Sequence, residues 1–476
     1  MTLLQDMADF VTGSTFNDIS KEARDQLKIR VLDGIGCAIG ALDGDPMRMV
    51  RAHTSSFEMQ GKCTLIGGGN TAPDRAAFHN GALVRYLDFN DSYLAKGETC
   101  HPSDNLAPVL AAAEFAGQDG REFLTALAVA YQVQCRLSDV APVRAKGFDH
   151  TAQGAYAVAA GVSRALGLDR EKTANAIAIS GTAFNALRVT RTGSLSHWKG
   201  LAYPNTAFGC THAALLAMQG ITGPQEVFEG NKGFMEAIAG HFELAWQKEN
   251  LERVRQTILK KYNAEIHSQA SIDGLLELKR ESGFKAADVE RVELETFDVA
   301  YHIIGGGEEG DKTTVRIKEE ADHSLPYMLA VAILDDGVMP EQYAPERIRR
   351  QDVQELLRKV HVRAEDAFSR RFPDEMPCRI IVGLKNGSSL EKSKRDYEGF
   401  HTNPARWESA VRKFERLSRP FTTEALRSEI VDTISGIEDA PVSRLTGLLS
   451  LVQCSRDASG SSHKPVAEGE GKYGKE

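Results

Sequence analysis

The sequence predicts a mainly α-helical protein with an α+β part, in which a large all-helical domain is interrupted by a smaller α/β domain. The chain has 476 residues, and single hydrophobic cores rarely exceed roughly 250–300 residues, so more than one domain is expected. Apolar residues recur at helical spacing over the first half of the chain and again near its end. Between these parts, short segments alternate polar and apolar residues as strands do.

Helical patterns follow one another through most of the first half of the chain. In Lys21–Leu42, the apolar residues Leu27, Val31 and Ile35 are spaced so that they share one helix face. Residues typical of strands are not concentrated in alternating runs here, so no large sheet is expected. Thr222–Gln225 has the spacing of a capping box and predicts the start of one more helix. The other predicted helices, rich in alanine and glycine, are Asp104–Ala116, Glu122–Arg136, Gly154–Leu166, Lys172–Ala186 and Asn205–Gln219.

The middle of the chain has the pattern of an α/β unit. Arg291–Phe297 alternates as a half-buried strand does. Arg379–Leu384 and Ser388–Glu391 flank an Asn-Gly pair and predict a β-hairpin. A helix is expected at Ser324–Leu334. Helical patterning then returns in three segments, Ala405–Leu417, Thr423–Gly436 and Val442–Val452.

These patterns predict the domain boundaries. We assign residues 1–256 and 398–454 to the helical domain and residues 257–397 to the α/β domain. Residues 455–476 are rich in Gly, Ser, Lys and Glu and lack apolar periodicity, so we predict a disordered tail.

Composition excludes several classes of function. The 57 Lys and Arg residues against 66 Asp and Glu give a net charge of -9, which argues against a nucleic-acid partner. No apolar run reaches the roughly 18–20 residues of a membrane helix, so no membrane partner is expected. The first residues resemble neither a secretory signal nor a transit segment, and we expect a cytoplasmic protein.

No cofactor or metal is expected. The seven cysteines are scattered, with no CxxC pair, which argues against a disulfide framework, structural zinc or an iron–sulfur cluster. No clear metal-ligand spacing links the histidines. Gly305–Gly310 fits the dinucleotide pattern GxGxxG, but it lacks the strand before it and the apolar helix after it, so a loop is the better interpretation.

A first group of candidate site residues comprises Asp88, Ser92 and His101. Asp88 and Ser92 are four residues apart and would share a face if they lay on a helix. His101 precedes Pro102, which disfavours helical geometry and indicates a loop. An acid, a hydroxyl and an imidazole would then meet where a helix ends. The alternative is a surface helix end with capping side chains.

The other candidates are basic. His150 precedes a helix of small residues, whose dipole favours a neutral imidazole, although a lone histidine there is more often structural. Arg188, Arg191 and Lys199 lie in a predicted loop of an acidic protein, which is typical of a polycarboxylate site or of a solvated loop. A Lys260–Lys261 pair lies at the predicted domain boundary, where sites are common. Cations, histidines and an acid together suit proton transfer on a polyanion.

The chain is identified as a member of the MmgE/PrpD family, which includes 2-methylcitrate dehydratase and cis-aconitate decarboxylase. The resemblance covers about residues 5–450. It is carried by Val31–Cys37, Leu87–Ser92, His101–Ser103, Asp149–His150, Arg191–Gly200, Lys260–Tyr262 and Ala321–Tyr327. The resemblance implies that the α/β domain is a lid, that the site lies between the domains, and that the protein forms a homodimer.

The family pattern also implies which residues form the site. These are Asp88, Ser92, His101, His150, Lys199, Tyr301 and one lysine of the Lys260–Lys261 pair. The cations, with Arg188 and Arg191, would bind the carboxylates of a tricarboxylate substrate. One of His101 and His150 would take the C–H proton, and the other histidine, or a protonated Asp88, would protonate the departing hydroxyl.

The resemblance therefore predicts a cofactor-independent hydro-lyase that dehydrates 2-methylcitrate or a related alkylcitrate. Three alternatives stay open at this point. The chain would instead decarboxylate cis-aconitate to itaconate, isomerise or epimerise a small dicarboxylate, or serve as a non-catalytic scaffold. Asp88, His101, His150 and Lys199 argue against the scaffold, because packing alone does not require them.

Overall fold

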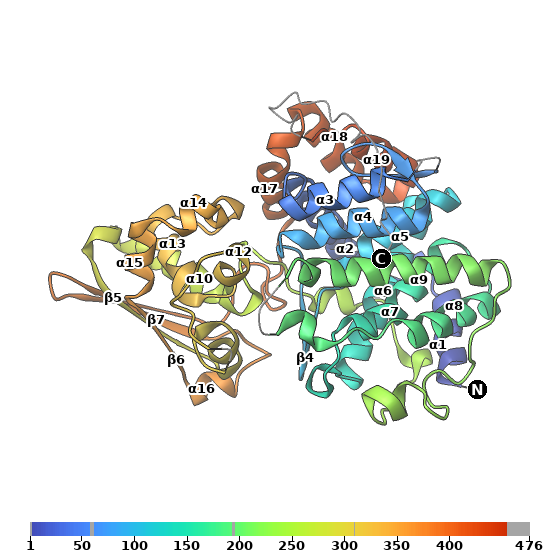
Figure 1. Cartoon of the computed structure of the whole chain (residues 1–476), viewed down its shortest axis with the longest axis horizontal. Coiled ribbons are helices and arrows are strands. Elements are labelled where there is room, and N and C mark those ends of the chain that lie inside the picture. Colours follow the sequence, from blue (N-terminus) through green and yellow to red (C-terminus); the bar gives the residue numbers. More distant parts are fainter. Residues whose placement is uncertain (1, 58–60, 193–195, 309, 455–476) are drawn as a thin grey trace, which may run out of the picture.

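The computed structural model describes residues 2–57, 61–192, 196–308 and 310–454. The predicted tail, 455–476, lies outside these residues. Figure 1 shows a large helical body and a smaller body that carries a sheet. Within the described ranges, no helix combines the length and apolar character that crossing a membrane requires.

The helical body is built from the two ends of the chain. Its helices are α1 (Leu3–Gly13), α2 (Lys21–Gly40), α3 (Asp45–Ser55), α4 (Pro73–Tyr86), α5 (Leu106–Ala116), α6 (Gly120–Val140), α7 (Thr151–Ala165), α8 (Arg170–Ala183), α9 (Trp198–Met218), α17 (Trp407–Ser418), α18 (Glu424–Ser435) and α19 (Val442–Leu449). Two short antiparallel pairs accompany them, β1 (Cys63–Thr64) with β2 (Asn70–Thr71) and β3 (Tyr93–Ala95) with β4 (Glu98–Cys100).

Small residues let these helices pack closely, as their composition predicts. On α7, a Cβ added to Gly161 would lie 2.8 Å from the Cβ of Ala130 on α6 and 2.9 Å from a methyl group of Val109 on α5. Real Cβ atoms do not come this close, so a larger residue at 161 would push the three helices apart. The same helix begins at Thr151 and thereby presents His150 at its N-terminus.

The smaller body holds a four-stranded sheet in the order β6-β5-β7-β8. Its strands are β5 (Val289–Thr296), β6 (Val360–Ala364), β7 (Cys378–Leu384) and β8 (Ser389–Lys394). β5 is parallel to β6 and antiparallel to β7, and β7 and β8 form the predicted hairpin. Its helices are α10 (Gln269–Ser282), α11 (Asp298–Ala300), α12 (Lys318–Ala321), α13 (Leu325–Asp335), α14 (Pro345–Ile348), α15 (Gln351–Leu357) and α16 (Asp366–Ser369). Of these, α10 packs on β7 and β8.

Two separate hydrophobic cores support the proposed domain division. One core collects buried residues between 4 and 259 and between 405 and 452, together with Met339. The other collects buried residues between 258 and 400. The chain therefore leaves the helical body once, forms the smaller body, which we call the lid below, and returns to the helical body.

The prediction of a helix that begins at Thr222 is wrong. Residues 225–229 form a turn, closed by a hydrogen bond from the Gly230 amide to the Glu226 carbonyl. The turn does not continue, because Gly230 and Gly233 follow it within four residues and glycine is a poor helix former. The Gly223 amide instead binds the Asn175 side chain on α8.

Candidate active site

A cavity of about 1200 Å³ is lined by residues of both bodies. Seven of the ten predicted site residues line it: Asp88, His101, His150, Arg188, Arg191, Lys199 and Lys260. The lid contributes Glu265, His267 and His323, among others. This placement between the bodies is the one that the family pattern implies.

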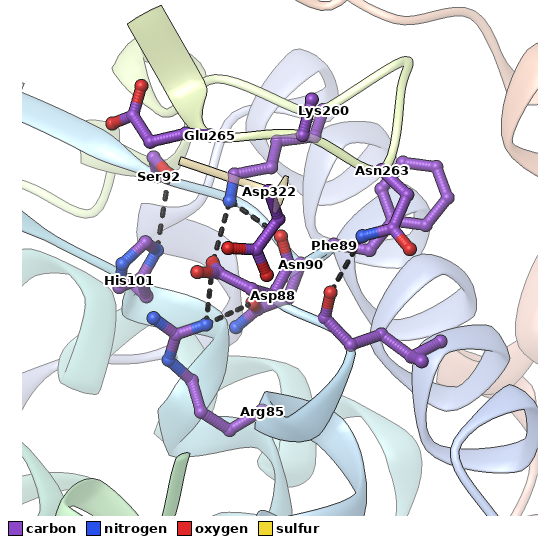
Figure 2. Close-up of polar contacts among 12 residues, drawn as sticks. Arg85, Asp88, Phe89, Asn90, Ser92, His101, Lys260, Asn263, Glu265 and Asp322 are labelled. Atoms are coloured by element: carbon purple, nitrogen blue, oxygen red, sulfur yellow. Dashed lines mark hydrogen bonds and ion pairs between the residues drawn. The ribbon is translucent and has the colours of Figure 1, made fainter. Parts of the chain in front are cut away.

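Asp88 does not lie on a helix, so the condition under which it would share a helix face with Ser92 is not met. Helix α4 ends at Tyr86, and Asp88 has a left-handed backbone with φ of 53°. Such a residue is typical just after a helix C-terminus. The backbone reversal directs the Asp88 carboxylate back toward Arg85 on the last turn of α4, as Figure 2 shows.

Three cations surround the Asp88 carboxylate. Its Oδ1 is 2.7 Å from Lys260 Nζ and 2.8 Å from Arg85 Nη1 (Figure 2). Its Oδ2 is 3.5 Å from Lys199 Nζ. Burial alone would raise the pKa of Asp88, but the three cations outweigh it and hold the pKa well below the usual range. A protonated Asp88 is therefore not available to protonate a leaving hydroxyl, which removes one predicted role.

The two neighbouring lysines face different ways. The Lys260 side chain is buried and also donates to the Asp88 carbonyl at 2.6 Å. Lys261 Nζ binds Asp273 at 2.6 Å, and its side chain is 40% exposed. Lys260 is thus the member of the pair that lines the cavity. Asn263 holds this segment in place, because its side chain donates to the Leu87 carbonyl at 2.7 Å.

His101 is fixed in one orientation by its surroundings. Its Nδ1 is 2.8 Å from the Asp91 carbonyl and 3.1 Å from Ser92 Oγ. Because a carbonyl only accepts, Nδ1 carries the proton and Nε2 keeps a lone pair. Burial and the charge of Arg85 place the pKa of His101 well below its usual value, so the ring is neutral. Ser92 lies behind His101 rather than on the cavity wall.

His150 is backed by a carboxylate. Its Nδ1 is 3.0 Å from Asp149 Oδ1, and the other Asp149 oxygen is 2.6 Å from Arg191 Nε. Burial and Arg191 lower the pKa of His150, although Asp149 opposes them. Its Nε2 has no hydrogen-bond partner within the described part of the chain. A neutral imidazole with a free Nε2 and a carboxylate on Nδ1 is the arrangement of a general base.

Arg188 is the predicted cation with the clearest opening for an anion. It lines the cavity, and no hydrogen bond or ion pair of its side chain is found among the described residues. Burial and the nearby guanidinium of Arg144 lower its pKa. Two guanidiniums near one another at a cavity wall favour a bound carboxylate. Arg191, by contrast, is already engaged with Asp149.

Lys199 lies on the first turn of α9 rather than in the predicted loop. Its Nζ contacts His323 of the lid, 3.1 Å from Nε2. Burial lowers the pKa of Lys199, while Asp322 and Asp88 oppose the shift. A buried lysine with a lowered pKa gives up its proton more readily than a free one.

Some residues fall outside the predicted set. Tyr301 does not line the cavity, although its neighbour His302 does, and its assignment stays a prediction. Sequence reasoning missed Arg85, Arg144 and His323. Arg85 had one available signal, since it belongs to an otherwise apolar stretch of α4. The 193–195 part of the basic segment lies outside the described residues. Among the residues that the structure describes, no group of three or more His, Cys, Asp or Glu side chains is placed to hold a metal ion.

Lys413 of α17 holds the loops behind the site. Its Nζ donates to the Phe89 carbonyl at 2.7 Å and to the Lys260 carbonyl at 3.0 Å, and it forms an ion pair with Asp33 Oδ1 at 2.7 Å. The last part of the helical body thereby ties the Asp88 loop to the Lys260 segment.

Lys413→Met is expected to destabilise the protein by about 3–5 kcal/mol, because it leaves the Asp33 carboxylate buried without its cation. Urea unfolding followed by circular dichroism measures the loss. The double variant Asp33→Asn/Lys413→Met is expected to recover part of it, since neither charge is then buried alone. A single variant as stable as the parent contradicts this account of the contact.

The fold and the cavity together define a class of protein: a helical body and a smaller α/β body with a cavity between them that is lined by cations and histidines. The MmgE/PrpD N-terminal domain matches residues 5–247, and the MmgE/PrpD C-terminal domain matches residues 262–436. The chain belongs to the MmgE/PrpD family, as its sequence motifs predict.

Similar proteins with assigned activities are dehydratases. The chain is 27% identical to 2-methylcitrate dehydratase of Escherichia coli K12 over 418 residues, covering 82% of this chain and 84% of that protein. It is 26% identical to the mitochondrial 2-methylcitrate dehydratase of Yarrowia lipolytica, covering 83% and 79%. It is also 26% identical to alkylcitrate dehydratase phiI of a fungal species, covering 82% and 83%. These relatives identify the chain as an enzyme of the hydro-lyase class.

Proposed function

We propose that the protein dehydrates 2-methylcitrate or a related alkylcitrate without a cofactor. One observation carries this proposal: the same cavity is lined by His150, a neutral imidazole held by the Asp149 carboxylate, and by the ammonium of Lys199. Dehydration needs one group to take a proton and another to give one. The names of the relatives, 2-methylcitrate dehydratase and alkylcitrate dehydratase, support the same reaction and the same class of substrate.

The proposed roles follow from the charge state of each group. Arg188 binds a substrate carboxylate, and His150 Nε2 removes the proton from the carbon beside another carboxylate. Lys260 and Arg85 keep Asp88 ionised, and the positive charge around it stabilises the negative charge that builds up during proton removal. The C–H electron pair forms the C=C bond, the C–O bond breaks, and the departing hydroxyl takes a proton from Lys199 and leaves as water.

Lys199 is the best donor for that step, because the other candidates are occupied or deprotonated. Asp88 is ionised, and His101 is neutral with its Nδ1 proton bound to the Asp91 carbonyl. Lys260 directs two of its hydrogen bonds to Asp88. His101, 5.5 Å from His150 between ring centroids, is then placed to orient the substrate beside the base.

Proton NMR of the purified, EDTA-treated protein tests the proposal. With 2-methylcitrate we expect the signals of a 2-methylaconitate product. With cis-aconitate, the appearance of itaconate would instead assign decarboxylation. The absence of product signals with both compounds would contradict this substrate range. Longer alkylcitrates and dicarboxylate isomerisation would then be tested.

We also propose that the enzyme is a homodimer. Large apolar side chains are exposed just before and at the start of α9, at Leu187, Val189 and Trp198, and neighbouring exposed apolar residues are typical of an interface. Light scattering is expected to give twice the mass of the chain, and Trp198→Asp is expected to shift the mass toward the monomer. A monomeric parent protein contradicts the proposal.

A further inference from the structure

His323 links the lid to the helical body at the proposed proton donor. It lies between α12 and α13, next to Asp322, and lines the cavity. Its Nε2 is 3.1 Å from Lys199 Nζ, while its Nδ1 is hydrogen-bonded to the Asp322 carboxylate. No role in the reaction has been assigned to it above.

The two hydrogen bonds determine where the proton of the ring lies. A carboxylate only accepts, so Nδ1 donates to Asp322. An ammonium only donates, so Nε2 accepts from Lys199. Burial would raise the pKa of Asp322, but Lys318 and Lys199 overcome this effect and lower it, so the acceptor stays ionised. With Lys199 as an ammonium, the His323 ring therefore carries its proton on Nδ1 and directs the lone pair of Nε2 toward Lys199 Nζ.

The groups that face this pair come from both bodies. Lys199 faces Asp88 on the helical side and Asp322 and Lys318 on the lid side, with Arg85 nearby. His323 also lies near Glu265. The exposed fraction of its side chain is 18%, and that of Lys199 is 13%. His323 lines the cavity, so solvent in the cavity can reach its ring.

We propose that His323 returns a proton from solvent to Lys199 after each dehydration. This inference rests on the proposed function of the site. Lys199 gives its proton to the departing hydroxyl and becomes a neutral amine. His323 then takes a proton from solvent at Nε2 and passes it to Lys199 Nζ, while Asp322 stabilises the imidazolium that forms between the two steps. His150 gives the proton that it removed from the substrate back to solvent, so the protons balance over one cycle. His323 ends each cycle neutral, and it acts through Lys199 without touching the substrate.

Substitution and chemical rescue test the relay. His323→Ala is expected to lower the turnover of 2-methylcitrate about 100-fold, the low end of what a proton-transfer group contributes. His323→Gln keeps hydrogen-bonding groups but not proton transfer, so it should lose as much. Imidazole added to His323→Ala should restore turnover in proportion to its concentration. His361→Gln is the matched control, since His361 is exposed on β6 and does not line the cavity.

Three outcomes would overturn the relay: full turnover of His323→Gln, a loss that imidazole does not restore, or an equal loss in His361→Gln. A second measurement needs no turnover. In NMR spectra of ¹⁵N-histidine-labelled parent protein, the signals of His323 are identified as those that are missing from the spectrum of His323→Gln. At neutral pH these signals should show a ring protonated only at Nδ1. A ring protonated at Nε2 overturns the relay even if the parent protein leaves 2-methylcitrate unchanged. That inactivity by itself contradicts only the proposed function.

Discussion

Replacing Lys260 with methionine is expected to lower turnover at least about 100-fold, the scale of one lost electrostatic group in an active site. The same replacement at Lys261 should leave turnover within about twofold. Lys260 Nζ donates to both the carbonyl and the carboxylate of Asp88, so its loss disturbs the position and the charge of the acid together. Lys261 binds Asp273 away from the cavity.

The two adjacent variants form a matched pair. Both remove one positive charge from the same segment, so global changes in charge cancel in the comparison. Circular dichroism and urea unfolding check that Lys260→Met is folded when its kcat is measured. Equal losses in the two variants would show that the segment, and not the direction of the Lys260 side chain, determines activity.

His150→Ala is expected to lower kcat by about 10²–10⁴, the usual contribution of a positioned base. In the parent enzyme the acid limb of the pH profile should lie below the ordinary histidine pKa of 6.5. The reason is that burial and Arg191 lower the pKa of His150, so the base stays unprotonated as the pH falls past that value. Steady-state rates measured within roughly two pH units of the ordinary histidine pKa define the limb.

Asp149→Asn decides which histidine is the base. The Asp149 carboxylate raises the pKa of His150, so removing its charge should move the acid limb to lower pH and reduce kcat because the base is weaker. If His101 is the base, the limb should stay in place, since Nδ1 of His101 binds the Asp91 carbonyl and not Asp149. An unchanged limb with a normal kcat would contradict the role of His150.

The local parts of the fold were predictable because they depend on neighbouring residues. The hairpin of β7 and β8 follows from its Asn-Gly turn, and the core helices follow from apolar spacing. Helix ends were harder to predict. Pro204 is typical of a helix start, yet α9 begins at Trp198 and continues through it. Lys199 therefore lies on a helix instead of in a loop.

The residue types of the site were predictable from the sequence, but the contacts between their side chains were not. Asp88, His101 and His150 stand in recognisable motifs, and Arg85 is a near neighbour of Asp88 in the sequence. Their charge states also depend on Lys260 and Arg191, which only the tertiary fold brings close. The contact between Lys199 and His323 joins residues 124 positions apart. No local pattern indicates such a contact, even though His323 lies within a motif that carried the family resemblance.

The Lys413 contact also has a consequence for biosynthesis. A ribosome that has made every residue lining the cavity, the last of which is Phe372, has not yet made the cation that neutralises Asp33. Because domains tend to fold as their residues emerge, N-terminal parts first, the nascent helical body must wait for α17 before its charged interior is complete. Translation therefore completes the lid before it completes the helical body, because Lys413, which holds the loops behind the site, is made after the lid.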